Sequence, residues 1–249
     1  SAPFPNGYRP ETDLSEELGP EDASYYHSQI GVLRWMVELG RVDIITEVSL
    51  LSSHLALPRR GHLEAVFQTY AYLKVKHNST MVFDPTYPKI NRDEFKECDW
   101  RDMYGDVKEP IPPNAPEPRG KDIDLRLFVD SDCGGDEVTR RSRTGYFIYL
   151  NNAPIVFHSK KQNRVESSVF GAEFVALTDG IDRLRGLRYK LRMMGIEISG
   201  PSYCYGDNMS VIYNTQRPES ILKKKCNAIC YHHVRESVAM GESLTAHIR

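Results

Sequence analysis

The chain has 249 residues, enough for one large domain or two modest ones, each with its own hydrophobic core. Hydrophobic residues make up 40% of the sequence and charged residues 27%, which is typical of a soluble globular protein. No run of about 18 apolar residues occurs, so the sequence predicts no membrane-spanning helix and we expect no membrane partner.

The net charge of −2 conceals an uneven distribution along the chain. Residues 1–120 carry 13 Lys and Arg against 19 Asp and Glu, a balance of −6, whereas residues 121–249 carry 19 against 15, a balance of +4. A mildly basic region that holds a few essential acids could bind a polyanion with the help of a metal ion. The overall charge alone would not predict a nucleic-acid-binding protein.

The cysteines do not form the pattern of a disulfide framework. They are odd in number, scattered, and without a Cys-x-x-Cys pair, which indicates a reducing compartment. Cys226 and Cys230 stand one helical turn apart and close to His232, so two zinc ligands are geometrically possible. No second pair has finger-like spacing, and we do not expect zinc. The five cysteines are Cys98, Cys133, Cys204, Cys226 and Cys230.

The N-terminal third predicts a small helical bundle. Residues 1–22 are polar and rich in proline, and we expect a flexible lead-in without a signal peptide. Three helices are predicted over residues 23–83, where apolar residues recur at spacings of three and four, and residues 79–83 could add a strand. Asp43 could cap the second helix, and Pro58 would end it. The expected core residues are Tyr26, Ile30, Leu33, Val37, Ile44, Val48, Leu51, Leu55, Leu63, Val66, Tyr70 and Leu73.

A proline-rich stretch, residues 84–121, follows the bundle and is predicted to be a linker or a loosely packed connection. The pattern then changes to short alternating segments that predict strands, two of them joined by the tight-turn pair Asn151-Asn152. A long helix with an apolar stripe is expected at about 167–194, with Ser167 or Ser168 as its cap and Gly195 at its end. Over residues 122–249 the expected order is β-β-β-α-β-α-α-β, a mixed sheet with helices packed on it.

Three acids occupy positions where folding alone would not favour a carboxylate. Asp130 ends the first predicted strand, Asp207 ends the fourth, and Glu173 lies on the apolar face of the long helix. Two strand ends and a helix face can converge at one sheet edge, and a set of carboxylates is suited to Mg²⁺. Each acid also has an ordinary structural interpretation: Asp207 could cap the next helix, and Glu173 could pair with a basic residue. Taken together, the three favour a metal site.

Six ordered blocks within about residues 125–241 resemble the ribonuclease H domain of copia-type retrotransposon polyproteins. A looser resemblance to the thumb of the same family's reverse transcriptase is carried by Tyr26 to Leu33, Arg41 to Ile44, Leu50 to Ser52 and Tyr72 to Lys74. The six blocks are Phe128-Val129-Asp130-Ser131-Asp132-Cys133-Gly134-Gly135-Asp136, Arg141-Ser142-Arg143-Thr144-Gly145-Tyr146, Ser159-Lys160-Lys161-Gln162, Ala172-Glu173-Phe174-Val175-Ala176, Tyr205-Gly206-Asp207-Asn208-Met209-Ser210 and Tyr231-His232-His233-Val234-Arg235-Glu236.

The resemblance implies an α+β or α/β fold, a ribonuclease H-like mixed sheet flanked by helices, preceded by a thumb-like helical segment. It implies that Asp130, Glu173 and Asp207 are catalytic and bind two Mg²⁺ or Mn²⁺ ions, with Asp132 as an alternative ligand. The implied reaction is endonucleolytic hydrolysis of the RNA strand of RNA–DNA hybrids. Implied partners are the hybrid and the palm and fingers of the same polyprotein. The implied location is cytoplasmic, in a virus-like particle, or nuclear.

Candidate nucleic-acid contacts lie in the same blocks and in nearby basic clusters. Recognition of RNA requires contacts to 2′-hydroxyls, and lysines and arginines would contact phosphates. The basic residues between Arg183 and Arg192 are instead expected to line the solvated face of the long helix. The nominated contacts are Gly134, Arg141, Ser142, Arg143, Lys160, Lys161, Gln162, Asn208, Ser210 and His232, with Arg140, Arg164 and Lys223-Lys224-Lys225 as further phosphate ligands.

The sequence departs from the family pattern in two ways. It contains no Asp-Asp dipeptide, which the polymerase centre requires, so no DNA synthesis by this chain is expected. The family's fourth acid follows the fifth strand, and residue 249 lies on that strand, so we expect a C-terminally incomplete domain with impaired turnover. Two alternatives to the enzyme are a non-catalytic fragment that binds RNA–DNA hybrid and a decayed remnant of a retroelement.

Overall fold

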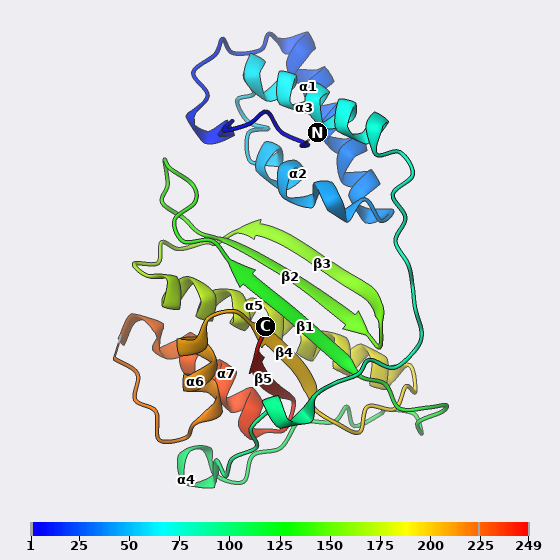
Figure 1. Cartoon of the computed structure of the whole chain (residues 1–249), viewed down its shortest axis with the longest axis vertical. Coiled ribbons are helices and arrows are strands. Elements are labelled where there is room, and N and C mark those ends of the chain that lie inside the picture. Colours follow the sequence, from blue (N-terminus) through cyan, green and yellow to red (C-terminus); the bar gives the residue numbers. More distant parts are fainter. Residues whose placement is uncertain (1, 224, 249) are drawn as a thin grey trace. The chain divides into compact units, whose positions relative to one another are not determined.

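The computed structural model describes residues 2–223 and 225–248 and divides into two compact units. The first unit comprises residues up to 82 together with 136–140, and the second comprises residues 83–135 and 141 onward (Figure 1). No helix among the described residues is long and apolar enough to cross a lipid bilayer.

The first unit is a bundle of three helices, as predicted. The helices are α1 (Pro20–Glu38), α2 (Ile45–Ser52) and α3 (Arg60–Val75), with short 3-10 turns η1 (Pro10–Thr12) and η2 (Val42–Ile44). Tyr26 of α1 is fully buried, and its hydroxyl donates to the carbonyl of Leu51 on α2 over 2.8 Å. This bond satisfies a polar group inside the apolar core and fixes α1 against the end of α2.

Three predictions for the first unit were wrong. The lead-in is packed rather than flexible, because Pro10 is buried and its carbonyl lies 2.9 Å from Nε2 of the buried His62. Asp43 does not cap a helix but forms an ion pair with Arg41 at 2.8 Å. Residues 79–83 form no strand, since no neighbouring strand offers them hydrogen bonds and Val82 is largely exposed.

The second unit is built on a mixed sheet of five strands in the order β3-β2-β1-β4-β5. Strands β1 to β3 form an antiparallel meander, whereas β4 pairs parallel with both β1 and β5. Asn151 has a positive φ of 53° at the β2–β3 turn, as its tight-turn role predicted. The strands are β1 (Leu125–Ser131), β2 (Arg143–Leu150), β3 (Ala153–Lys161), β4 (Ser202–Gly206) and β5 (Ser243–His247).

The helices α5 (Val169–Met193) and α7 (Ala228–Ala239) pack against one face of this sheet, and α6 (Met209–Gln216) follows β4. Ser168 caps α5 by accepting a hydrogen bond from the Gly171 amide. Helix and sheet approach closely at Gly180, where a Cβ would lie 2.9 Å from the Leu127 side chain. The observed element order matches the predicted β-β-β-α-β-α-α-β.

The proline-rich stretch is more tightly packed than predicted. It contains only a 3-10 turn η3 (Arg92–Glu94) and the single-turn helix α4 (Arg101–Tyr104), yet Phe95 and Trp100 are almost fully buried. Phe95 packs edge-on against Tyr203 and Tyr205, which project from the opposite face of β4 to Cys204. Two aromatic side chains therefore make this stretch part of the second unit.

Candidate metal centre

The three predicted carboxylates come together at one edge of the sheet. Asp130 is the penultimate residue of β1, Asp207 directly follows β4, and Glu173 lies in the first turns of α5. One carboxylate oxygen from each of the three lies within 4.8 Å of the others. Because β1 and β4 are parallel neighbours, their carboxyl ends meet at the same edge, and the start of α5 lies over it.

The start of α5 is held by a buried amide. Gln162, just after β3, donates from Nε2 to the carbonyl of Ala172 over 3.0 Å and to the hydroxyl of Thr144 over 3.1 Å. These bonds join β2, β3 and the first turn of α5 directly beside Glu173. The long helix consequently begins at a fixed position relative to the strand that carries Asp130.

Electrostatic repulsion is strong at this cluster. Glu173 is only 5% exposed, whereas Asp130 and Asp207 are open to solvent. Burial raises the pKa of the Glu173 carboxyl to about 7, and the neighbouring charges of Asp207 and Asp130 contribute to the rise. Within residues 2–223 and 225–248, no Lys, Arg or His side chain forms an ion pair with any of the three. Three carboxylates in this arrangement suit a hard cation.

Asp132, the alternative ligand that the resemblance implied, makes its contacts between β1 and β2. Its Oδ1 accepts a hydrogen bond of 2.5 Å from the Arg143 amide, and its carboxylate covers Gly135, where a Cβ would lie 2.0 Å from Oδ2. Asp132 is absent from the described group of carboxylates that could share a metal ion. The side chain instead closes the turn between β1 and β2.

Two nominated nucleic-acid contacts are part of the fold instead. Ser142 is fully buried and accepts a hydrogen bond from the Gly134 amide over 3.0 Å. Gln162 is 3% exposed and is engaged as described above. Both side chains are almost fully buried, so the structure does not support the prediction that either is a direct contact to nucleic acid. Polarity in a motif suggested contact, but burial made these groups internal hydrogen-bonding partners.

The other nominated residues remain near the surface. Asn208 caps α6 by accepting from the amides of Ser210 and Val211, so the cap is Asn208 and not Asp207. His232 is exposed, and its Nδ1 lies 2.8 Å from the hydroxyl of Tyr104. Arg141 and Lys160 are exposed. Lys224 lies outside the described residues.

Sequence reasoning missed two features of the second unit. His247, at the end of β5, places Nε2 2.9 Å from the carbonyl oxygen of Asp207 and so lies beside the sheet edge that carries the three carboxylates. Arg188 was expected on the solvated face of α5 but is 2% exposed and donates to Glu109 over 2.6 Å. Glu109 also binds Arg192. The alternating pattern of the last strand could have indicated where His247 lies. No local signal in the sequence pairs Arg188 with Glu109, which are 79 positions apart.

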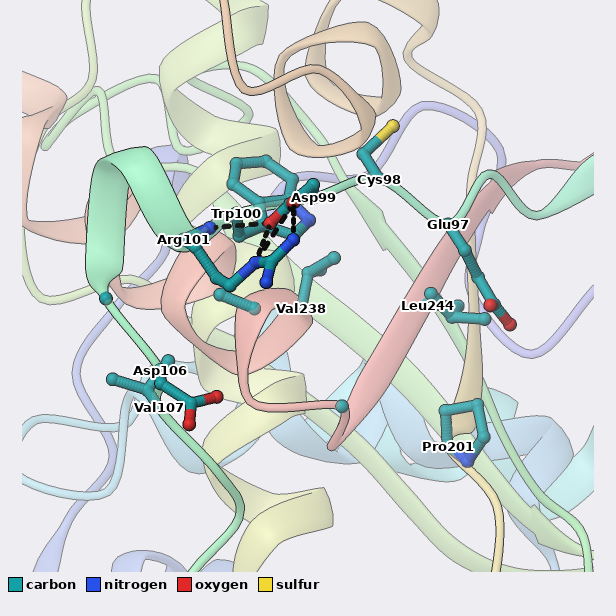
Figure 2. Close-up of a pocket in the computed structure, with 13 residues that line it drawn as sticks. Glu97, Cys98, Asp99, Trp100, Arg101, Asp106, Val107, Pro201, Val238 and Leu244 are labelled. Atoms are coloured by element: carbon teal, nitrogen blue, oxygen red, sulfur yellow. Dashed lines mark hydrogen bonds and ion pairs between the residues drawn. The ribbon is translucent and has the colours of Figure 1, made fainter.

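A separate cavity of about 350 Å³ lies between the proline-rich stretch and the elements around α7 and β5. Figure 2 shows Trp100 beside Val238, with Leu244 and Pro201 on the other side and the carboxylates of Glu97 and Asp106 at the margin. None of the three clustered carboxylates lines this cavity. The cavity is therefore distinct from the candidate metal centre.

Comparison with known proteins finds relatives of this chain among the polyproteins of plant transposons. No protein-family model matches the chain. The Pol polyprotein of transposon RE1 from Arabidopsis thaliana is 25% identical over 227 residues, covering 91% of this chain. That of transposon RE2 from the same plant is 31% identical over 130 residues, covering 52% of this chain. The chain is homologous to retrovirus-related Pol polyproteins of plant transposons.

This relation to Pol polyproteins confirms the resemblance predicted from the motifs. The chain spans only 13% of the RE1 polyprotein and 9% of that of RE2. Among solved structures, ribonuclease H1 from the archaeon Halobacterium salinarum is similar over 50% of this chain and 84% of its own, with 11% identity and a TM-score of 0.39. The predicted mixed sheet with flanking helices is confirmed by the strand order of the second unit.

Proposed function

We propose that the chain is the ribonuclease H part of a retrotransposon Pol polyprotein and hydrolyses the RNA strand of RNA–DNA hybrids with divalent metal ions. The observation that carries this proposal is the convergence of Asp130, Glu173 and Asp207 within 4.8 Å. The similarity to transposon Pol polyproteins supports the same assignment.

The donor set fits Mg²⁺ or Mn²⁺. Three carboxylates offer only oxygen ligands, and two of them are open enough for coordinated water and a phosphate to share the ion. Two such ions, when bound, would supply charge stabilisation for the attacking and leaving oxygens of an in-line phosphoryl displacement. The uncompensated repulsion around Glu173 favours binding, because a cation would relieve it.

The residues of the chain have distinct roles in this proposal. Glu173, which is buried and fixed by the start of α5, holds its carboxylate in one position, whereas Asp130 and Asp207 face the solvent from which substrate arrives. The side chains of Arg141 and Lys160 are exposed, so both can contact phosphates directly. In this proposal the phosphate contacts come from the segment before β2 and from the end of β3, whereas the metal contacts come from two strand ends and a helix.

Cleavage of a labelled RNA–DNA hybrid tests the proposal. We expect the chain to cleave the RNA strand with Mg²⁺ or Mn²⁺, to lose activity in EDTA, and to lose at least about 100-fold in rate on Glu173→Gln, because a metal ligand is neutralised. Glu197→Gln, which removes an acid outside the cluster, should cleave normally. Hybrid binding without metal-dependent cleavage by the folded wild-type chain would reject the enzyme and favour a non-catalytic binding fragment.

A further inference from the structure

Arg235 on α7 is a buried cation without a carboxylate partner among the described residues. It is fully buried, although arginine is almost never fully buried unless it is paired. Its guanidinium donates instead to backbone carbonyls of one loop: Nη2 to Pro218 over 2.6 Å and to Arg217 over 3.3 Å, and Nη1 to Ser220 over 3.2 Å. The side chain of Arg235 thus binds the carbonyl groups of three of the four residues 217–220.

Two aromatic rings complete this arrangement. The guanidinium lies 4.9 Å from the ring centre of Trp100 and 4.5 Å from that of Tyr231. The Tyr231 hydroxyl donates to the same Ser220 carbonyl over 2.7 Å. Trp100 comes from the proline-rich stretch and also walls the cavity drawn in Figure 2. Cation–π contacts and carbonyl acceptors together offset the cost of burying the charge.

The loop that Arg235 holds leads into exposed cations. Lys223 and Lys225 are exposed, and neither has an ion-pair partner among the residues that the structure describes. The loop begins where α6 ends, and α6 begins two residues after Asp207. Eight helical residues extend about 12 Å, which is on the order of four nucleotide steps along one strand. Lys223 and Lys225 follow seven and nine residues after the end of this helix, which makes them candidates for contacts with phosphates that flank a phosphate at the metal centre.

We propose that Arg235 is a positioning residue, which together with Trp100 and Tyr231 fixes residues 217–223 so that Lys223 and Lys225 contact the phosphate backbone of the hybrid. The proposal rests on the proposed function, since it takes the RNA–DNA hybrid as the ligand. It goes further by assigning a role to a motif residue that touches neither metal nor substrate. A fixed loop binds phosphate more tightly than a mobile one, because less conformational entropy is lost on binding.

The test is a double-mutant cycle on hybrid binding, measured in EDTA so that cleavage does not interfere. Lys223→Gln with Lys225→Gln should weaken binding about tenfold at about 0.1 M salt and reduce the slope of log Kd against log salt by about 2. In an Arg235→Lys background the same pair should weaken binding by less than about twofold. Lysine keeps the charge but cannot reach several carbonyls or stack as a planar group. Coupling of this size identifies a positioning role.

Matched controls separate positioning from stability. Arg188→Lys alters another buried arginine, which donates to Glu109 and to the carbonyl of Gly200, and should leave the tenfold lysine effect unchanged. Tyr231→Phe removes both hydrogen bonds of the Tyr231 hydroxyl with Ser220, to its carbonyl and to its side-chain hydroxyl, and keeps the aromatic ring beside the buried charge. It gives an informative variant if Arg235→Lys does not fold, and should reduce the lysine effect to about threefold. Hydrogen exchange of residues 217–223 should rise in both loop variants and stay unchanged in Arg188→Lys.

The outcomes distinguish this proposal from the proposed function. An equal lysine effect in all backgrounds, or no lysine effect in the otherwise wild-type chain, overturns the positioning role while hybrid cleavage still stands. A chain that binds hybrid but does not cleave it overturns the enzyme, and the cycle still decides the role of Arg235. A wild-type chain that does not bind hybrid rejects both.

Discussion

Two acids in the second unit meet opposite surroundings. Glu109 lies between Arg188 and Arg192, and although burial alone would raise its pKa, hydrogen bonds from the two guanidinium groups lower it to about 2. Glu173 lies beside two other carboxylates, and its pKa is raised to about 7. The fold supplies the first acid with its counter-charges and leaves the second without any. The acid that links two elements of the fold is compensated internally, whereas the acid that we propose as a metal ligand keeps its charge unbalanced.

The largest expected change in stability comes from replacing the compensated acid, Glu109. Glu109→Gln should lower the free energy of unfolding by about 3 kcal/mol, because it leaves the buried Arg188 without a carboxylate. Urea denaturation at neutral pH measures this loss. Glu117→Gln, an exposed acid of the same stretch, should change stability by less than about 0.5 kcal/mol. Equal effects of the two substitutions would contradict a structural role for Glu109.

The same acid predicts a loss of stability in acid. A carboxyl whose pKa is lower in the folded than in the unfolded protein stabilises the fold above its unfolded value, and this stability disappears as the pH falls toward its folded value. For Glu109 the window lies between about 4.5 and about 2. Wild type should lose about 2 kcal/mol more than Glu109→Gln between pH 5 and pH 2.5, as measured by urea midpoints, since the variant lacks the titrating group. Parallel pH profiles for the two proteins would refute this assignment.

The uncompensated acid should respond with the opposite sign. In the absence of divalent metal, Glu173→Gln should raise the free energy of unfolding by about 1.5 kcal/mol, because it removes one of three mutually repelling charges. Thermal unfolding in EDTA measures the change. A destabilisation of similar size to that of Glu109→Gln would mean that Glu173 is held by internal partners, and the contrast between the two acids would fail.

The smallest expected effect is the stabilisation of the folded chain by a divalent metal ion. Mn²⁺ at about ten times its Kd should stabilise the wild-type chain by about 1.4 kcal/mol and leave Glu173→Gln almost unaffected. Asp132→Asn should keep the metal response, because Asp132 closes the β1–β2 turn rather than joining the cluster. Melting temperatures with and without Mn²⁺ measure all three proteins. A response lost in Asp132→Asn and retained in Glu173→Gln would assign the ligands the other way round.

Patterns along the chain predicted what local sequence determines. Alternation predicted the strands, and three- and four-residue spacing predicted the helices. Two acids at strand ends and one on the apolar face of the long helix predicted the cluster of Asp130, Asp207 and Glu173. The local pattern could not predict whether a polar side chain faces solvent or the interior, and for this reason Ser142 and Gln162 were assigned to substrate.

Contacts between residues far apart in the chain could not be predicted from the sequence. Arg188 meets Glu109, and Phe95 meets Tyr203, across large separations along the chain, and each looks unremarkable within its own segment. Arg235 was recognised as part of a motif, but its contacts with the loop and with Trp100 depend on three segments folding together.

The parallel pairing of β1 with β4 has a kinetic consequence. Asp130 and Asp207 are 77 positions apart in the sequence, and no tight turn between adjacent strands can bring them together. The β1–β3 meander can form from local contacts, whereas the β1–β4 ladder must wait for closure of a long loop that contains the whole of α5. The two aspartates should therefore meet late in folding, so that folding intermediates contain the meander before the three carboxylates come together.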